Sequence, residues 1–301
     1  MYIVIGGSGF LGRYVIKNIL NLTSEKVIGT YTKNLPQVKD NRLQWLKFDA
    51  QQADDIQRLN TISDNNSKVI YLASYSSPDF CEKNQKSSWD LNVTALANFV
   101  NTYTKAKCLY YASTDVVYGE SFQHTKFKEN ANLNPVNIYG VQKALAERII
   151  MAKNYNVFRL PLMMGPSLIE GKKHFFDKIY ESLDTANPID MFVDSYRSIL
   201  SFNQCAKLLI NLIEIYGSAD KKIINFASDQ AISKYELALK IAEKYGFEKN
   251  LIKPISIKDS EGIFVAKRAK ITEMDNSLLK SLLKLQSINL DFDKIDKEVL
   301  R

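Results

Sequence analysis

The chain has 301 residues, of which 46% are apolar and 24% charged, and this composition excludes a disordered, fibrous or collagen-like protein. A chain of this size can bury one large core, or a core with a smaller lobe beside it. The formal net charge is +7, but the lysines are scattered and form no basic block with interleaved aromatic residues. We therefore expect no nucleic acid as a partner, although a modest positive field would attract an anionic cofactor and an anionic substrate.

Several other classes of protein are excluded by pattern. No apolar run approaches the ~18 to 20 residues of a membrane span, so we expect no membrane partner. The first predicted strand begins at residue 2, so we expect no signal peptide and a cytoplasmic location. Three cysteines (Cys81, Cys108, Cys205) without Cys-x-x-Cys spacing argue against disulfides and zinc. The two histidines, His124 and His174, lie far apart; we expect loop or surface positions and no metal site.

Apolar, β-rich runs alternate with helical patterns along the first three quarters of the chain. This alternation predicts an α/β fold, a doubly wound parallel Rossmann sheet with a smaller C-terminal substrate-binding lobe. The expected strands are residues 2–5, 26–31, 43–48, 68–73, 108–112, 156–160 and 223–227, and the expected helices are residues 11–22, 53–62, 88–104, 138–153, 203–216 and 235–245.

The chain is expected to leave the sheet at Gly165-Pro166. We predict a dinucleotide-binding domain over residues 1–163, with its sheet completed by residues 197–228. Residues 164–196 and 229–301 are expected to form the substrate-binding lobe.

A glycine-rich turn follows the first strand. The segment Gly6-Gly7-Ser8-Gly9-Phe10-Leu11-Gly12 joins a strand to an amphipathic helix. Glycines at positions 6, 9 and 12 allow a tight turn, close approach of the backbone to a pyrophosphate, and close packing of helix on strand. The helix N-terminus would face the phosphates, so the segment predicts a dinucleotide site.

The end of the second strand indicates which dinucleotide is bound. NAD-selective Rossmann sites commonly place a carboxylate there, on the ribose hydroxyls. This chain has Thr32 and Lys33, with no carboxylate before Asp40. Lys33 and the Thr32 hydroxyl can receive a 2′-phosphate that a carboxylate would repel. NADP(H) is therefore favoured, with NAD(H) left open, as is the interpretation of Lys33 as a solvated loop lysine.

Tyr139 and Lys143 are four residues apart in a predicted helix, which places them on one face. A phenol with a pKa near ~10 is a poor proton donor at neutral pH, but an adjacent ammonium would lower that pKa. Tyr139 would then serve as a general acid. A surface Tyr and Lys on an ordinary helix remains the alternative for the pair taken alone.

Together, these motifs resemble those of the extended short-chain dehydrogenase/reductases. The resemblance rests on Gly6-x-x-Gly9-x-x-Gly12, on Tyr111-Ala112-Ser113-Thr114-Asp115-Val116-Val117-Tyr118-Gly119, and on Tyr139-x-x-x-Lys143. Ser113-Thr114-Asp115 followed by Asn134-Pro135-Val136-Asn137-Ile138-Tyr139-Gly140 is most similar to the dTDP-4-dehydrorhamnose reductase branch of sugar-nucleotide reductases. The likeness is specific over the first half of the chain.

The resemblance implies roles for further residues. Asp49 and Ala50 would contact adenine, Ala73 and Ser74 would pass the ribose, and Asn92 would support the lysine. The cofactor contacts it implies are Gly6, Gly9, Phe10, Leu11, Gly12, Thr32, Lys33, Asp49, Ala50, Leu72, Ala73, Ser74, Asn92, Tyr139 and Lys143. For Asn92, an ordinary helix-surface role is left open.

The catalytic group implied by the resemblance is Thr114, Tyr139 and Lys143. Hydride would pass from the nicotinamide to a ketone carbon while Tyr139 protonates its oxygen. Thr114 would stabilise the developing alkoxide, with Ser113 as a competing candidate. Asp115 and Val116, which follow Thr114, are expected at the substrate.

Two arginines resemble the family's grip on a nucleotide diphosphate. Arg197 lies in Tyr196-Arg197-Ser198-Ile199, and Arg268 lies in Lys267-Arg268-Ala269-Lys270. The chain departs from the family with Asn203-Gln204 in place of two acidic residues and with Ala269 in place of proline. For each arginine, an ion pair at the surface is the alternative.

The sequence thus predicts an NAD(P)-dependent reductase of a keto group, at C4, on a nucleotide-linked deoxysugar in cell-surface polysaccharide or deoxysugar biosynthesis. The expected partner is a nucleotide-diphosphate sugar, and a homodimer is left open. The alternatives are a 4-epimerase that retains NAD, a non-catalytic NADP-binding regulatory subunit, and a nucleic-acid-binding Rossmann protein that only the charge favours.

Overall fold

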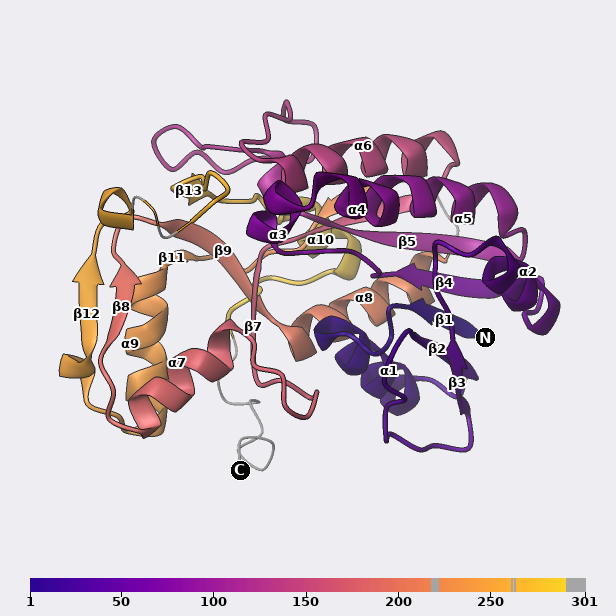
Figure 1. Ribbon diagram of the computed structural model, residues 1–301, viewed down its shortest axis with the longest axis horizontal. Coiled ribbons are helices and arrows are strands. Elements are labelled where there is room, and N and C mark those ends of the chain that lie inside the picture. Colours follow the sequence, from indigo (N-terminus) through magenta and orange to yellow (C-terminus); the bar gives the residue numbers. More distant parts are fainter. Residues whose placement is uncertain (218–221, 261, 263, 291–301) are drawn as a thin grey trace.

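The computed structural model describes residues 1–217, 222–260, 262 and 264–290. Within these residues, seven parallel strands form one sheet in the order β10-β6-β5-β4-β1-β2-β3 (Figure 1). The doubly wound parallel sheet predicted from the sequence is therefore confirmed. Its strands are β1 (Tyr2–Ile5), β2 (Val27–Tyr31), β3 (Leu43–Lys47), β4 (Ser67–Tyr71), β5 (Ala106–Thr114), β6 (Asn156–Leu160) and β10 (Ile223–Asn225).

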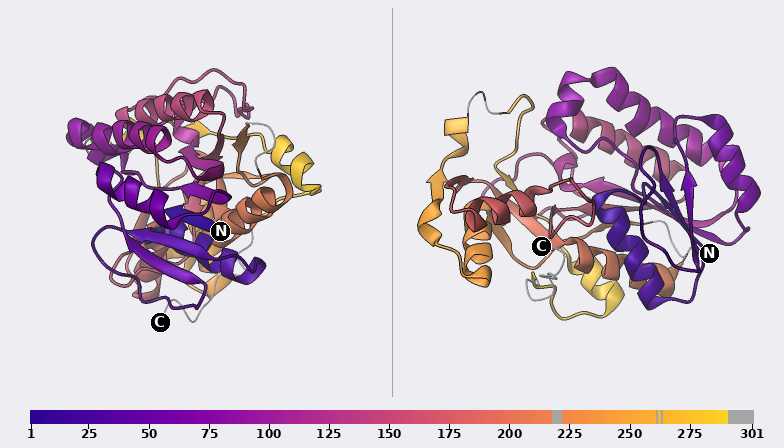
Figure 2. Two further views of the ribbon diagram at one scale, coloured as in Figure 1. Left: turned by 90° about the vertical axis from the view of Figure 1, so that its right-hand side faces the viewer. Right: turned by 60° about the horizontal axis from the view of Figure 1, so that its bottom comes forward.

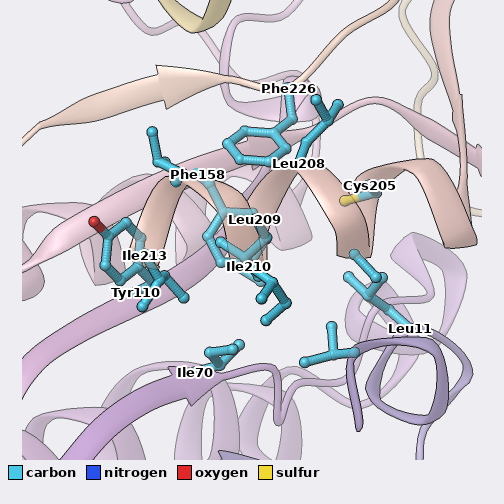
Figure 3. Packing of buried hydrophobic residues seen from close by; sticks show 14 of the residues in the cluster. Leu11, Ile70, Tyr110, Phe158, Cys205, Leu208, Leu209, Ile210, Ile213 and Phe226 are labelled. Atoms are coloured by element: carbon cyan, nitrogen blue, oxygen red, sulfur yellow. The ribbon is translucent and has the colours of Figure 1, made fainter. Parts of the chain in front are cut away.

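Helices cover both faces of this sheet because its inner strands are apolar on both faces. In β1, Tyr2 and Val4 point into one core and Ile3 and Ile5 into the other. The first core includes residues of α1 (Phe10–Leu22) and α8 (Phe202–Tyr216) (Figure 3). The second includes residues of α2 (Ala53–Ile62), α5 (Leu96–Thr102) and α6 (Ile138–Ala152).

One long helix expected over residues 88–104 is divided in the structure. α4 (Gln85–Trp89) continues into a π-helix, η1 (Asp90–Ala95), and then into α5. A short helix, α3 (Pro78–Lys83), precedes them. A π-helical turn inserts a residue and turns the following side chains, and such turns are frequent at functional sites. The expectation of a regular helix was wrong at this point.

A smaller lobe lies beside the C-terminal ends of the large sheet's strands, on the left in Figure 1. Strand β9 (Tyr196–Ser201) pairs there with three short strands, and β8 (Ile189–Phe192) pairs with β12 (Ile252–Ile255). Helices α7 (Phe175–Asp184) and α9 (Lys234–Tyr245) cover them, sharing a separate core. The three partners of β9 are β7 (Leu162–Met164), β11 (Ala231–Ser233) and β13 (Ile271–Thr272).

The last described helix returns to the large sheet. α10 (Ser277–Leu283) places Leu279 in the core shared by α1 and α8, and Ile288 follows it there. Figure 2 shows this helix, in yellow, away from the small lobe. Our division of the chain at residue 163 remains a prediction, and residues 291–301 of the expected lobe lie outside the described residues. No helix of the described part is long and apolar enough to cross a membrane.

Candidate active site

The glycine turn lies at the point where the strand order reverses. β1 has β4 on one side and β2 on the other, and ligands of doubly wound sheets bind at such a point, beyond the strands' carboxyl ends. Gly6 has φ +83°, and a Cβ there would lie 2.9 Å from the Ala73 nitrogen. A Cβ on Gly12 would lie 2.4 Å from the Gly6 carbonyl oxygen. The turn therefore accepts glycine alone at both positions, as a close approach of phosphates requires.

Aromatic side chains fix the far side of this turn. Phe10 packs on His174 and on Phe202, with ring centroids 5.0 and 6.3 Å apart. His174 begins α7 between these rings, and burial lowers its pKa to about 4. His174 lies in the loop before α7, as expected, and is partly buried because Phe10 and Phe202 pack on it. His124 also lies in a loop and is half-exposed, beside Glu273.

Sequence reasoning missed Arg13, which follows the last glycine of the motif. Its Nε atom is buried and has no hydrogen-bond partner in the described part of the chain. Burial lowers the pKa of its guanidinium. An unpaired buried donor is costly unless a ligand satisfies it. The position of an arginine directly after Gly12, at the start of the helix, was the signal that could have found it.

The residues expected at adenine and ribose lie along the same edge of the sheet. Thr32 and Lys33 follow β2 and are exposed. Asp49, after β3, accepts a hydrogen bond from the Gln51 amide at 3.0 Å, which shapes the turn, and Ala50 is buried beside it. Leu72 continues β4 by donating its amide to the Ile5 carbonyl. These positions agree with the expected roles, which remain predictions.

Asn92 holds the loop that follows β4. Its Oδ1 atom accepts hydrogen bonds from the Tyr75 amide at 2.8 Å and the Ser74 hydroxyl at 3.0 Å. Its Nδ2 atom donates to the Tyr75 carbonyl and to Gln142 Oε1. Asn92 is buried within η1, so the helix-surface alternative is wrong. Its described contacts support the cofactor-side loop and the residue before Lys143, but they do not include Lys143 itself.

Lys143 is buried beneath the expected reaction centre. Its ammonium donates to the carbonyl oxygen of Ala112 and lies 4.1 Å from the centroid of the Tyr111 ring. Burial lowers its pKa to about 7, and the nearby carboxylate of Glu147 opposes that shift. α6 begins just before the pair, at Asn137, whose side chain accepts the Gly140 amide. The lysine is therefore held in one place by strand β5.

Tyr139 is also buried, with an exposed fraction of 7%. Burial and the charge of Asp115 raise the pKa of its phenol, while a hydrogen bond with Thr114 acts in the opposite direction. The lowered phenol pKa expected from Lys143 is therefore contradicted in this structure. The physical reason is that Lys143 turns its ammonium to Tyr111 and the Ala112 carbonyl, and both groups of the pair are desolvated.

The structure separates the two candidate hydroxyls of β5. Ser113 donates to Glu147 Oε1 at 2.5 Å, and Glu147 forms a buried, two-bond ion pair with Arg159 at 2.9 and 2.7 Å. Successive strand residues point to opposite faces, so Thr114 points away from this network. Thr114 interacts with Tyr139, which favours it over Ser113 as the group at the carbonyl. The Glu147–Arg159 pair is a second feature that sequence reasoning missed.

Asp115 and Arg197 form an ion pair across the two lobes. Arg197 Nε donates to Asp115 Oδ2 at 2.7 Å and Nη2 donates to Oδ1. Asp115 is 1% exposed and also accepts the Thr114 hydroxyl at 3.1 Å. Arg197 is therefore an ion-paired residue, as the alternative held, but the pair is largely buried and adjoins the catalytic group. Val116 follows in a short 3₁₀ turn, where its amide bonds to the Thr114 hydroxyl.

Arg268 has a similar partner in Asp79. Arg268 Nη2 donates to Asp79 Oδ2 at 2.8 Å, and Asp79 Oδ1 accepts the amides of Val265 and Ala266. Asp79 lies in the first turn of α3, a few residues after the Ser74–Tyr75 loop. The two arginines thus form ion pairs with a carboxylate that follows β5 and with one in α3. Figure 1 shows the small lobe beside this end of the large sheet.

A doubly wound sheet with a glycine turn at its switch point, and a threonine, a tyrosine and a lysine beside it, defines the extended short-chain dehydrogenase/reductases. The chain belongs to this class. Within it, the chain is a member of the RmlD substrate binding domain family, whose model matches residues 1–292. The predicted resemblance is confirmed at this level.

Known proteins resemble the chain in sequence or in fold. Methionine adenosyltransferase 2 subunit beta from Danio rerio is 24% identical over 264 residues, 84% of this chain and 76% of that protein. A hypothetical dTDP-4-dehydrorhamnose reductase from Sulfolobus tokodaii superposes with a TM-score of 0.81 at 24% identity, covering 97% and 98% of the two chains. The dTDP-4-dehydrorhamnose reductase from Bacillus anthracis str. Ames, in complex with NADP, gives 0.77 at 19%, covering 96% and 94%.

Proposed function

We propose that the chain reduces a keto group, at C4, of a nucleotide-linked deoxysugar with NADPH, in polysaccharide or deoxysugar biosynthesis. The observation that carries the proposal is the position of Thr114, Tyr139 and Lys143 beside the switch point, with Arg197 of the small lobe paired to Asp115 next to Thr114. The family membership and the reductases among the structural neighbours support the substrate class.

The chain's own residues suit a bound nicotinamide dinucleotide. The glycine turn has no room for side chains where a pyrophosphate would lie, and Arg13 offers an unpaired buried donor near it. When bound, the nicotinamide supplies the hydride. Lys33 and Thr32 favour the 2′-phosphate, and the complex of the Bacillus anthracis reductase with NADP supports that choice.

Three side chains divide the work at the carbonyl. Thr114 donates a hydrogen bond to the ketone oxygen and so stabilises negative charge as the alkoxide forms. Tyr139 gives its phenolic proton to that oxygen. A phenol whose pKa is raised by burial stays protonated at neutral pH, which is the form that a proton donor needs. Lys143 holds the ribose side of the cofactor and supplies positive charge below the phenol.

The test follows NADPH absorbance with dTDP-, UDP-, GDP- and CDP-4-keto-6-deoxysugars as substrates. Oxidation of NADPH with one of these sugars, and formation of the corresponding 6-deoxysugar nucleotide, is the expected result. The absence of reduction with all four nucleotides, while NADPH binds, would contradict the proposal. Interconversion of two sugar epimers without net NADPH consumption would instead support the 4-epimerase.

A regulatory subunit is the second candidate, because methionine adenosyltransferase 2 subunit beta is a relative over most of the chain. In that case NADPH binding would alter the activity of a partner enzyme and no sugar would be reduced. Retention of the threonine, tyrosine and lysine favours the reductase. Adding the chain, with and without NADPH, to a methionine adenosyltransferase catalytic subunit separates the two candidates.

A further inference from the structure

Lys234 is a cation for which the described part of the chain provides no carboxylate partner. Its ammonium lies 5.1 Å from the centroid of the Phe192 ring and 5.9 Å from that of Phe264. Burial, together with the positive charges of Arg197 and Arg268, lowers its pKa to about 8. A cation removed from water is costly unless an anion reaches it.

Strand pairing brings these three cations together. In β9, Arg197 lies opposite Ile232 of β11 and opposite Thr272 of β13. β11 ends at Ser233, so Lys234 follows it directly on one side of Arg197. Arg268 precedes β13 on the other side. Lys234 and Arg268 also contact the same aromatic ring, since the Arg268 guanidinium carbon lies 4.8 Å from the centroid of Phe264.

The position of Lys234 in its helix adds to this charge. It is the first residue of α9, at the positive end of a helix of 12 residues. The acidic residue of that first turn, Glu236, accepts the Ser233 amide at 2.7 Å in a capping box. A cation at this end is disfavoured by the helix dipole, so helix stability gives no reason for a lysine here.

The two arginines differ from Lys234 in having partners. Arg197 is paired with Asp115 and Arg268 with Asp79, so each pair carries no net charge. The arginines can therefore direct hydrogen bonds to a ligand but add little net attraction for an anion. Lys234 therefore adds net positive charge to this small-lobe site.

We propose that Lys234 binds a phosphate group of a nucleoside diphosphate, and that it sets the preference of this site for a diphosphate over a monophosphate. The proposal rests on the proposed function, because the ligand is the nucleotide part of the same substrate. Lys234 would contact the phosphate through its ammonium while the four carbons of its side chain stay packed on the phenylalanine rings. It takes no part in hydride or proton transfer.

The experiment measures binding of UDP, dTDP, UMP and dTMP by titration calorimetry in the presence of NADPH. Lys234→Met keeps the packed carbons and removes the charge, Lys234→Arg keeps the charge, and Lys240→Met removes an exposed lysine from the same helix as a matched control. Lys234→Met should weaken the diphosphates about 10-fold or more and the monophosphates less, since a charged hydrogen bond is lost. Lys234→Arg should recover most of the affinity, and Lys240→Met should equal the parent.

A second measurement needs no substitution, and therefore does not depend on whether a variant folds. In the parent chain, UDP or dTDP should slow acetylation of Lys234 by acetic anhydride relative to Lys240, as read by mass spectrometry. Equal diphosphate affinity in Lys234→Met and the parent, or no protection of Lys234, would overturn the proposal. A parent that binds diphosphates through Lys234 but reduces no sugar would leave this inference standing and contradict the reductase alone.

Discussion

The ammonium of Lys143 lies 4.1 Å from the centroid of the Tyr111 ring. Strand β5 thus provides both contacts of this buried lysine, the Tyr111 ring and the Ala112 carbonyl, while helix α6 provides the lysine itself. Burial lowers the pKa of this lysine to about 7, so the pKa lies close to neutral pH. Its protonation state should therefore respond to conditions around neutrality.

We expect Lys143 to give the folding free energy a specific pH dependence. Its pKa is about 7 in the folded chain and ~10.4 when unfolded, so between these values the unfolded chain binds more protons. Stability should therefore rise with pH across that window, by at most about 1.4 kcal/mol per pH unit from this group. Urea unfolding of the parent and of Lys143→Met at several pH values checks it. Parallel curves for the two proteins would refute the assignment.

Removing the phenolic hydroxyl should abolish most turnover. Tyr139→Phe should leave the fold and NADPH affinity near their parental values and lower kcat about 10²-fold or more, because positioned general acids contribute 10² to 10⁴. Thr114→Val should cost less, since the carbonyl keeps one donor. The matched control is Ser113→Ala, which removes a hydroxyl that bonds to Glu147 and faces away. A larger loss of kcat in Ser113→Ala than in Thr114→Val would show that Ser113, and not Thr114, acts at the substrate carbonyl.

Selectivity for NADPH should depend on Lys33. Lys33→Ala should weaken NADPH about 10-fold and leave NADH affinity near the parental value, because a partly exposed charge contact contributes on the order of 1 to 2 kcal/mol. Arg13→Met should weaken both cofactors if its unpaired donor serves the shared pyrophosphate. Fluorescence titration with the two dinucleotides measures each effect. Tighter binding of NADH than NADPH by the parent would contradict the NADP assignment.

Replacing either arginine with alanine should raise KM for the sugar nucleotide. Arg268→Ala should do so roughly 10-fold, with cofactor affinity retained, since a charged hydrogen bond to a ligand is worth about 1.5 to 3 kcal/mol. Arg197→Ala should in addition lower stability, because it leaves Asp115 buried without its partner. Arg197→Lys should rescue only part of the binding, since an ammonium lacks the planar fork. An unchanged KM in both alanine variants would show that the two arginines form ion pairs within the protein and do not bind the substrate.

The buried Glu147–Arg159 pair should matter more for stability than for binding. Glu147→Gln should destabilise the chain by about 3 to 5 kcal/mol, because Arg159 would keep its charge without a carboxylate. The double variant Glu147→Leu/Arg159→Met should be less destabilised than Glu147→Gln. Denaturant unfolding measures both. A single variant as stable as the parent would show that the pair is not needed.

The parts of the fold that were predicted correctly are those with a local signal. The strands of the large sheet were predicted from short runs rich in apolar residues. The bounds of α1, α2 and α6 were predicted to within a residue or two from their periodicity. Gly9 before α1 and Asn137 before α6 also mark where those helices begin. Much less of the small lobe could be predicted from the sequence, because its strands β7, β8, β11, β12 and β13 have only two to four residues each. Strands of that length are set by their partners.

The unpredicted parts of the site depend on residues far apart in sequence. Arg268 and Asp79 are 189 positions apart, and Arg197 and Asp115 are 82 apart, so no spacing could reveal either pair. The π-helix likewise contains Asn92, which bonds to the backbone of Tyr75, 17 positions away. The raised pKa of Tyr139 follows from burial, which a motif does not report.

The position of β10 has a consequence for how the protein is made. β6 lies next to the edge of the large sheet, and its outer neighbour β10 is a strand of three residues that leaves the ribosome only after α7, β8, β9 and α8. Until then β6 is an exposed hydrophobic edge, the kind of surface on which nascent chains aggregate or pair wrongly. Destabilising changes in β10 should therefore reduce the yield of folded protein more than its thermal stability.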